Sequence, residues 1–192
     1  MTEETTTRSV LAQVRDLVPP RPLTSSESRQ VLERQATRLL RLMDVEGPPV
    51  PIEQLIGDLP RLEIKRFRDL PSSGRTQWAG NRWVILVAED EAKVRQRYSM
   101  AHELAHVVYH PLARLSLQPQ RETTAEDRLE SACEYFAACV LMPRLWMKRA
   151  YFDERIQDVP SLSRLFGVSW LAMRVRLEQL GFVAALEPRR SA

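Results

Sequence analysis

The stretch His102-Glu103-Leu104-Ala105-His106 holds two of the three histidines in the chain, and His110 follows four residues later. On a helix, residues four apart lie about 40° apart around the axis, so both imidazoles of the stretch project to one side and can bind one metal ion. Glu103 is offset by about 100° from His102, so its carboxylate can take a proton from a metal-bound water. This spacing predicts a hydrolytic zinc site with Glu103 as its catalytic base.

The residues on either side of this stretch predict a helix that is mostly buried. The helical pattern runs from about Glu91 to His110 and ends at Pro111. Its apolar members are Met100, Ala101, Leu104, Ala105, Val107 and Val108. A buried histidine needs a polar or metal partner, and a buried glutamate needs one even more. This context favours a metal site over a helix that matches the pattern by chance.

A catalytic zinc ion takes three protein ligands, so a third ligand must join His102 and His106. No histidine lies outside the window 102–110. His110 would sit about 6 Å further along the helix axis than His106, which is too far to share the ion comfortably. We therefore expect the third ligand to be a carboxylate or a cysteine from elsewhere in the chain.

The next predicted helix, over about 123–141, supplies such ligands. Three glutamates follow one another at four-residue spacing, Glu126, Glu130 and Glu134. A row of this kind is more often a solvent-exposed face, but apolar residues along the same segment indicate that it packs against something. We expect the middle glutamate, Glu130, to be the ligand and Glu134 to hydrogen-bond a ligating histidine. Cys133 is a weaker candidate, because a small buried thiol needs no function.

Two segments resemble the signatures of the ImmA/IrrE family of metallo-endopeptidases. The first is Arg95-Gln96-Arg97-Tyr98-Ser99-Met100-Ala101 and the stretch that follows it, against R-x-R-[FY]-[ST]-x-A-H-E-L-G-H. The second is Glu130-Ser131-Ala132-Cys133-Glu134-Tyr135-Phe136-Ala137-Ala138-Cys139-Val140-Leu141-Met142-Pro143, against E-x-x-x-N-x-[FG]-A-x-x-L-L-M-P. The chain departs from these patterns at Ala105, where the family has Gly, and at Glu134, where it has Asn or Asp.

The resemblance covers about residues 60–181 and implies a gluzincin-type zinc endopeptidase, a hydrolase with Glu130 as the third Zn²⁺ ligand. It also implies a protein substrate, because such proteins typically cleave a transcriptional repressor or antitoxin and so switch on a stress, phage or mobile-element response. No spacing rule identifies the group that stabilises the transition state. The candidates are Tyr98, Tyr109, His110, Tyr135 and Tyr151.

The C-terminal segment offers a competing interpretation. Leu165-Phe166-Gly167-Val168-Ser169, followed by Arg176-Leu177 and Leu180-Gly181, is similar to a helical unit that often ends the family's domain. Its expected core positions are Leu162, Leu165, Val168, Leu171, Val175 and Leu180. Arg174 and Arg176 could then face DNA, as in a helix-turn-helix. Packing or contact with a repressor is the favoured role, and DNA contact is the alternative.

Two other functions stay open beside the peptidase. One is a DNA-binding regulator with a metal-bound sensor domain, for which Glu103→Gln would change nothing. The other is a scaffold that binds a repressor without cutting it, although a pure binder has no use for Glu103. A general peptidase of broad specificity is a further possibility, which casein digestion would reveal.

The amino-acid composition limits the class of protein to which the chain can belong. The chain has 192 residues, of which 44% are hydrophobic and 28% charged, and this predicts one globular domain with at most a small appendage. The longest apolar run, Trp83 to Ala88, is too short to span a membrane. The acidic N-terminus lacks a secretory signal, and two cysteines make no disulfide framework, so we expect the cytoplasm. The net charge of +3 does not by itself indicate a nucleic-acid partner.

We expect a flexible tail over residues 1–23, a zinc metallopeptidase domain over 24–150 and a helical unit with a short tail over 151–192. The expected fold is α+β and zincin-like. A small, mostly antiparallel sheet packs on the zinc helix, and the Glu130 helix crosses the zinc helix. Capping boxes at Thr24–Glu27 and Thr123–Glu126 open two helices. A hairpin turns at Gly80-Asn81, and the strand Trp83–Val87 is the expected edge for an extended substrate peptide.

Overall fold

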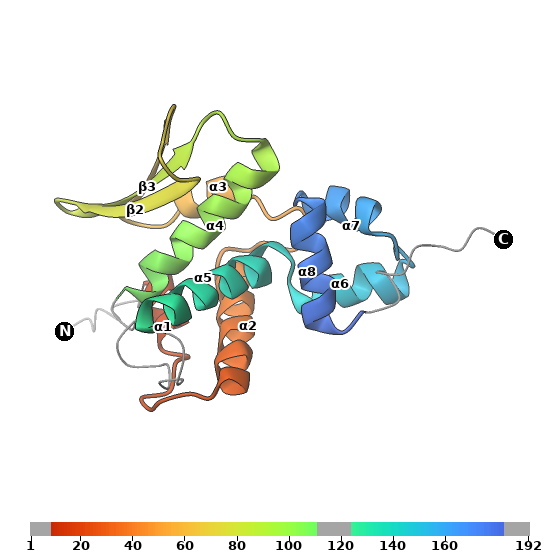
Figure 1. Cartoon of the computed structure of the whole chain (residues 1–192). Coiled ribbons are helices and arrows are strands. Elements are labelled where there is room, and N and C mark those ends of the chain that lie inside the picture. Colours follow the sequence, from red (N-terminus) through yellow and green to blue (C-terminus); the bar gives the residue numbers. More distant parts are fainter. Residues whose placement is uncertain (1–8, 111–123, 183–192) are drawn as a thin grey trace, which may run out of the picture.

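The computed structural model describes residues 9–110 and 124–182. The expected α+β class is confirmed, since these ranges hold helices and a single three-stranded sheet, which lies at one end of the molecule beside α4 (Figure 1). None of the helices in the described ranges is both long and apolar enough to cross a membrane. The elements are α1 Val10–Arg15, α2 Ser25–Leu42, α3 Ile52–Gly57, β1 Leu62–Phe67, β2 Gly74–Ala79, β3 Arg82–Ala88, α4 Lys93–Tyr109, α5 Ala125–Leu141, α6 Arg144–Lys148, the π-helical turn η1 Arg149–Asp153, α7 Val159–Phe166 and α8 Trp170–Leu180.

The sheet is mixed, so the expectation of a mostly antiparallel sheet was wrong. Its strand order is β1-β3-β2. The predicted hairpin is present: Gly80 takes a positive φ of 67° in the turn, and β2 pairs antiparallel with β3. On the other side of β3, β1 pairs in parallel, with Leu62 opposite Trp83. Residues 83–87 are therefore central, and the free edge beside α4 belongs to β2.

Helix α4 lies between the sheet and α5, and α2 packs behind α5 (Figure 1). On one face of β3 the side chains of Ile85 and Val87 are fully buried. The adjacent positions of β2 on the same face are Gly74 and Thr76, through the register Gly74↔Val87 and Thr76↔Ile85. This arrangement places the edge strand β2 directly beside the middle of α4.

Capping boxes start two of the long helices. At α2 both reciprocal bonds between Thr24 and Glu27 form, as the sequence predicts. At α5 the box is shifted by one residue from the prediction, because Thr124 caps the helix and Asp127 supplies the returning carboxylate. Residues 111–123, which include Thr123 and Pro111, lie outside the described part of the chain.

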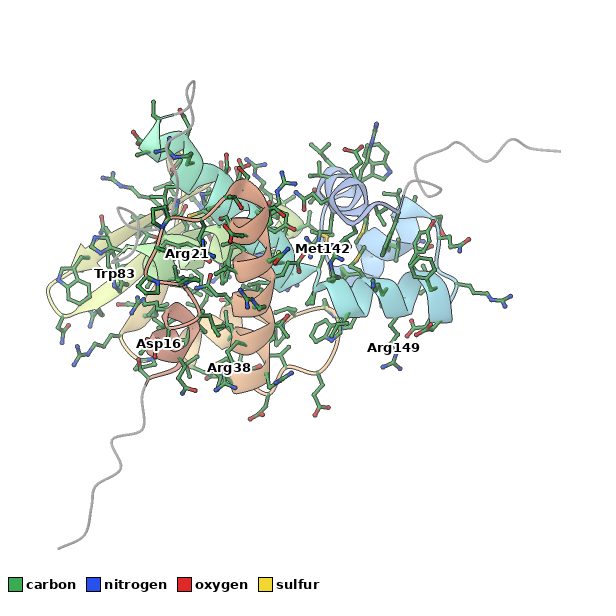
Figure 2. The ribbon with its side chains drawn as sticks, turned by 90° about the horizontal axis from the view of Figure 1, so that it is seen from below. Asp16, Arg21, Arg38, Trp83, Met142 and Arg149 are labelled. Atoms are coloured by element: carbon green, nitrogen blue, oxygen red, sulfur yellow. The ribbon has the colours of Figure 1, made fainter. Side chains whose placement is uncertain are left out.

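Within the predicted tail over 1–23, α1 packs into the core through the buried Leu11 and Val14. Arg15 reaches the end of α4, where its guanidinium donates to the carbonyl oxygens of Val107 at 2.8 Å and Val108 at 3.0 Å. These carbonyls belong to the last turn of α4, which has no intrahelical donors left for them. Figure 2 shows α1 and the linker that follows it, with Asp16 and Arg21, beside α2.

Helix α8 turns a different face to the core than the sequence predicts. Gly167 at φ 63° ends α7 and the Ser169 hydroxyl caps α8, so the expected short turn is present. However, Leu171 and Val175 are 64% and 42% exposed, whereas Arg176 is completely buried. The expectation that Leu171 and Val175 are core positions was therefore wrong, and the buried Arg176 does not fit the alternative in which it faces DNA.

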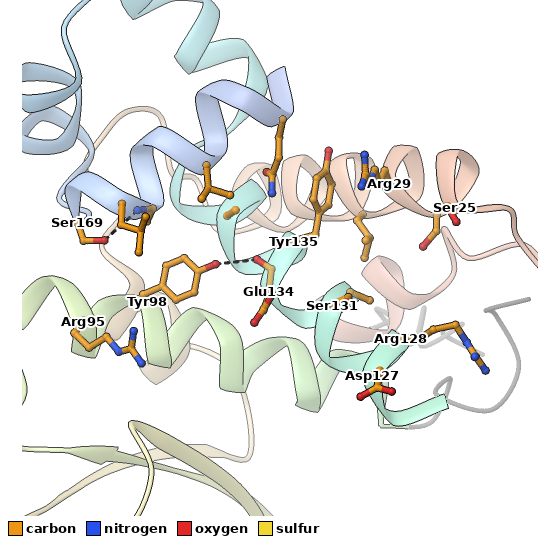
Figure 3. A pocket seen from close by; sticks show the side chains of 18 of the residues that line it. Ser25, Arg29, Arg95, Tyr98, Asp127, Arg128, Ser131, Glu134, Tyr135 and Ser169 are labelled. Atoms are coloured by element: carbon orange, nitrogen blue, oxygen red, sulfur yellow. Dashed lines mark hydrogen bonds between the residues drawn. The ribbon is translucent and has the colours of Figure 1, made fainter. Parts of the chain in front are cut away.

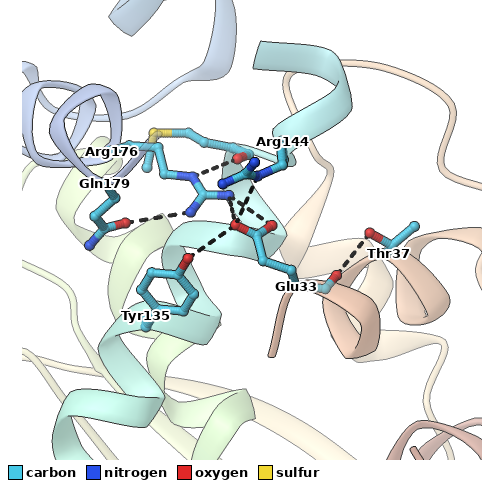
Figure 4. A network of polar contacts seen from close by, with 7 residues as sticks. Glu33, Thr37, Tyr135, Arg144, Arg176 and Gln179 are labelled. Carbon is cyan, nitrogen blue, oxygen red and sulfur yellow. Dashed lines mark hydrogen bonds and ion pairs between the residues drawn. The ribbon is translucent and has the colours of Figure 1, made fainter. Parts of the chain in front are cut away.

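Arg176 connects α8 to α2 and to the C-terminal end of α5 through hydrogen bonds (Figure 4). Its Nη2 lies 2.9 and 3.1 Å from the two carboxylate oxygens of Glu33 on α2, and its Nε donates to the carbonyl of Met142 at 3.0 Å. The Tyr135 hydroxyl donates to the same Glu33 carboxylate at 3.2 Å. These hydrogen bonds hold α8 against α2 and α5.

Candidate metal centre

Three side chains from α4 and α5 converge on one point. The Nε2 atoms of His102 and His106 lie 3.1 Å apart. The nearest oxygens of Glu130 lie 3.3 Å from His102 Nε2 and 3.4 Å from His106 Nε2. Two ligands of a tetrahedral zinc ion at about 2.05 Å are separated by about 3.3 Å, so the spacing of these atoms fits a metal ion. The structure thus brings together the three predicted ligands in a group that could hold a metal.

Glu103 lies beside this group, pressed against the edge strand. It is buried, and its Oε2 accepts a hydrogen bond of 2.7 Å from the Thr76 hydroxyl on β2. A Cβ on Gly74 would lie 3.0 Å from both Cγ and Oε1 of Glu103, which is closer than most real contacts, so a larger residue at position 74 would require the Glu103 side chain to shift. Burial raises the pKa of the Glu103 carboxyl above its usual value, and the Thr76 hydrogen bond opposes that shift.

Gly74 and Thr76 were not found by sequence reasoning. Neither belongs to a motif with a fixed spacing, and their contacts with Glu103 cross from β2 to α4 over 27 positions of sequence in the case of Thr76. The only signal that could have found them is the register of the hairpin, which places residues 74 and 76 on the face of the sheet that packs on α4.

The remaining candidates lie outside the three-residue group. The Tyr98 hydroxyl donates to the backbone carbonyl of Glu134 at 3.1 Å, and burial raises the pKa of Tyr98 to about 12 (Figure 3). The Glu134 carboxylate is exposed, and within the described ranges it makes no hydrogen bond to either imidazole, contrary to the expected contact. His110 packs against Trp83, with ring centroids 4.8 Å apart. Cys133 is fully buried.

Beside Tyr98 and Glu134 a pocket of about 580 Å³ opens between α2, α4, α5 and α8 (Figure 3). Its lining combines the exposed Leu171 and Val175 of α8 with polar groups of α5 such as Ser131 and Glu134. Tyr98 lies one turn before His102 on α4, and Glu134 one turn after Glu130 on α5, so the pocket adjoins the metal centre.

Comparison with known proteins agrees with the site. Residues 61–178 match the family model Peptidase M78, described as the IrrE N-terminal-like domain. This match covers more than half of the chain, and the chain therefore belongs to this metallopeptidase-type family, as the resemblance to ImmA/IrrE proteins predicts. A search of curated proteins found no match.

The fold is shared with proteins of known structure. A Mycobacterium tuberculosis transcriptional regulator superposes with a TM-score of 0.59 at 18% sequence identity. The superposition covers 95% of this chain and 54% of that protein, so the chain spans about half the length of the regulator. At this level of identity the likeness concerns the fold alone.

Proposed function

We propose that the protein is a zinc-dependent endopeptidase. The observation that carries this proposal is the convergence of His102, His106 and Glu130 beside a buried Glu103, in a chain of a metallopeptidase family. Two histidines and one carboxylate are a typical catalytic zinc set, because they leave a fourth position for water or substrate. The pattern on α4 and the third ligand on α5 support hydrolysis of an amide bond.

In this proposal His102, His106 and Glu130 hold the ion. Zinc, when bound, supplies a Lewis acid that polarises the scissile carbonyl and lowers the pKa of a coordinated water to about 7. Glu103 takes the proton of the attacking water and delivers it to the leaving amine. Thr76 holds one carboxylate oxygen of Glu103 at 2.7 Å, which leaves the other, Oε1, for this proton transfer.

The substrate peptide is proposed to lie along β2 rather than along β3. An exposed strand edge can pair with an extended peptide through its main-chain groups. β3 has partners on both sides, whereas β2 pairs only with β3 among the described strands. Because Gly74 and Thr76 of β2 touch Glu103, a peptide on this edge would pass the metal centre.

The substrate is proposed to be a transcriptional repressor or antitoxin, and the reaction to take place in the cytoplasm. The family resemblance supports a repressor or antitoxin as the substrate, and two free, buried cysteines agree with a cytoplasmic location. The DNA-binding alternative loses support, because Arg176 is buried and Arg174 is held by Glu178 at 3.3 Å.

Metal content per chain is the first test, on the wild type, Glu130→Ala and Glu134→Ala. Both substitutions remove one exposed carboxylate from the same helix, one turn apart, so Glu134→Ala is a matched control. We expect one zinc in the wild type and in Glu134→Ala, and a loss in Glu130→Ala. Cleavage of a candidate repressor should be lost in Glu103→Gln with zinc retained. A wild type that binds no zinc when zinc is supplied would refute the proposal.

A further inference from the structure

Three aromatic rings form a ladder at one end of the metal centre. Trp78 on β2 packs edge-on against Trp83 on β3, with ring centroids 5.3 Å apart. Trp83 in turn packs edge-on against His110, with centroids 4.8 Å apart. We call Trp78, Trp83 and His110 the aromatic shelf. It joins the tip of the hairpin to the end of α4, and Figure 2 shows Trp83 at the far end of the sheet.

The shelf continues the surface that carries the proposed chemistry. On β2, Trp78 follows Thr76 by two residues and lies on the same face of the strand, about 7 Å further along. On α4, His110 follows His106 by one turn, about 6 Å further along the axis. Both distances correspond to about two residues of an extended peptide. A peptide on the β2 edge that passes Glu103 would therefore place a side chain two residues away on the shelf.

Trp78 is open to such a side chain. It is 52% exposed, although large aromatic residues normally bury most of their surface when nothing binds them. Trp170 on α8 is exposed to the same degree, 51%, but the guanidinium of Arg174 lies 5.5 Å from its ring centroid. In the part of the chain that the structure describes, no cation lies over Trp78 in this way.

The rings of the aromatic shelf indicate which side chain fits. The exposed Arg75 and Arg82 lie at the alternate positions of the hairpin, on its other face, and Arg82 pairs with Glu63 at 2.8 Å, so they do not select the side chain on the shelf. An aromatic ring would extend the edge-to-face ladder, which is the geometry that aromatic pairs prefer.

We propose that the aromatic shelf is a specificity subsite that takes a phenylalanine or tyrosine of the substrate, two residues from the cleaved bond. This inference rests on the proposed peptidase function. It assigns to Trp78 a binding role that is separate from metal binding and proton transfer.

The test measures binding without cleavage. Zinc-loaded Glu103→Gln is titrated with fluorescein-labelled, acetylated hexapeptides of alanine and glycine that carry one phenylalanine, leucine, lysine or no large residue, and anisotropy is recorded. We expect the phenylalanine peptide to bind about tenfold more tightly than the alanine peptide. Adding Trp78→Ala should remove this preference, and Trp78→Phe should restore most of it. Trp170→Ala, the equally exposed control, should keep it.

Cleavage by the wild type is measured separately, on the same peptides by mass spectrometry. A cut two residues from phenylalanine, lost in Trp78→Ala with zinc content and melting temperature unchanged, supports the inference. Equal binding of all peptides, or a preference for lysine, overturns it. Phenylalanine-selective binding that depends on Trp78, with no cleavage by the wild type, would uphold the subsite and refute the peptidase function.

Discussion

Replacing Arg176 by alanine should destabilise the fold strongly, although the residue lies on α8, a helix of only 11 residues. The guanidinium is completely buried and makes paired contacts with Glu33 at 2.9 and 3.1 Å. Alanine would leave the Glu33 carboxylate, itself only 17% exposed, without its nearest cation. Breaking a buried ion pair by removing one partner costs about 3–5 kcal/mol. For a chain of this size that corresponds to a fall in Tm of about 6–20 °C.

The measurement is urea denaturation followed by far-UV circular dichroism, on the wild type, Arg176→Ala and Arg174→Ala. Arg174 lies two residues earlier on α8 and is exposed, and among the residues that the structure describes it pairs with Glu178 and with the ring of Trp170. Its loss should change the free energy of unfolding by less than about 0.5 kcal/mol. The double variant Glu33→Gln, Arg176→Met should lose less than the sum of its single variants, because the two residues are in contact. A loss below about 1 kcal/mol for Arg176→Ala would refute the reasoning.

Two further substitutions test contacts on either side of α4. Gly74→Ala should displace Glu103, whose Cγ and Oε1 lie 3.0 Å from the added Cβ, so we expect peptide cleavage to fall at least tenfold with zinc retained. Gly57→Ala, whose Cβ meets nothing within 4 Å, should leave cleavage unchanged, and equal activity of both variants would contradict the packing argument. Arg15→Ala should cost about 1–3 kcal/mol in urea denaturation, because two carbonyls at the end of α4 lose a charged donor. The exposed Arg34→Ala serves as its control, and a matching small loss in both would mean that Arg15 does not secure α4.

The sequence predicted the parts of the fold that depend on neighbours in the chain. The cap at Thr24, the turn at Gly80-Asn81 and the helical spacing of His102 and His106 each depend on residues within a few positions of one another. The placement of Glu130 beside the histidines needed a contact between two helices, and the resemblance to a family indicated it together with the spacing on α5.

Sheet order could not be predicted, because nothing local says on which side of β3 a strand will pair. β1 ends before β2 begins, yet it occupies the far side of β3 and leaves β2 at the edge. The short strand at 62–67 has the same alternation whether its partner runs parallel or antiparallel. The unbroken apolar run Trp83 to Ala88 was a local signal that this strand is central rather than an edge.

Helix α8 shows why periodicity alone chose the wrong face. Leu171 and Val175 are four residues apart, as are Met173 and Leu177, so the helix has two apolar rows. The structure buries Met173, Leu177 and Arg176 on one side. Burial of an arginine on that side is made favourable by Glu33, more than 140 positions away, together with the carbonyl of Met142.

The parallel pairing of β1 with β3 has a consequence for synthesis on the ribosome. The last residue of β1 is Phe67 and the last residue of β3 is Ala88, with the whole of β2 between them. At about 5–20 residues per second, translation of that interval takes about 1–4 s, whereas a hairpin forms in about 1–10 μs. The β2–β3 hairpin therefore closes almost as soon as it emerges, and β1 spends seconds beforehand as a nascent segment whose partner strand has not yet been made.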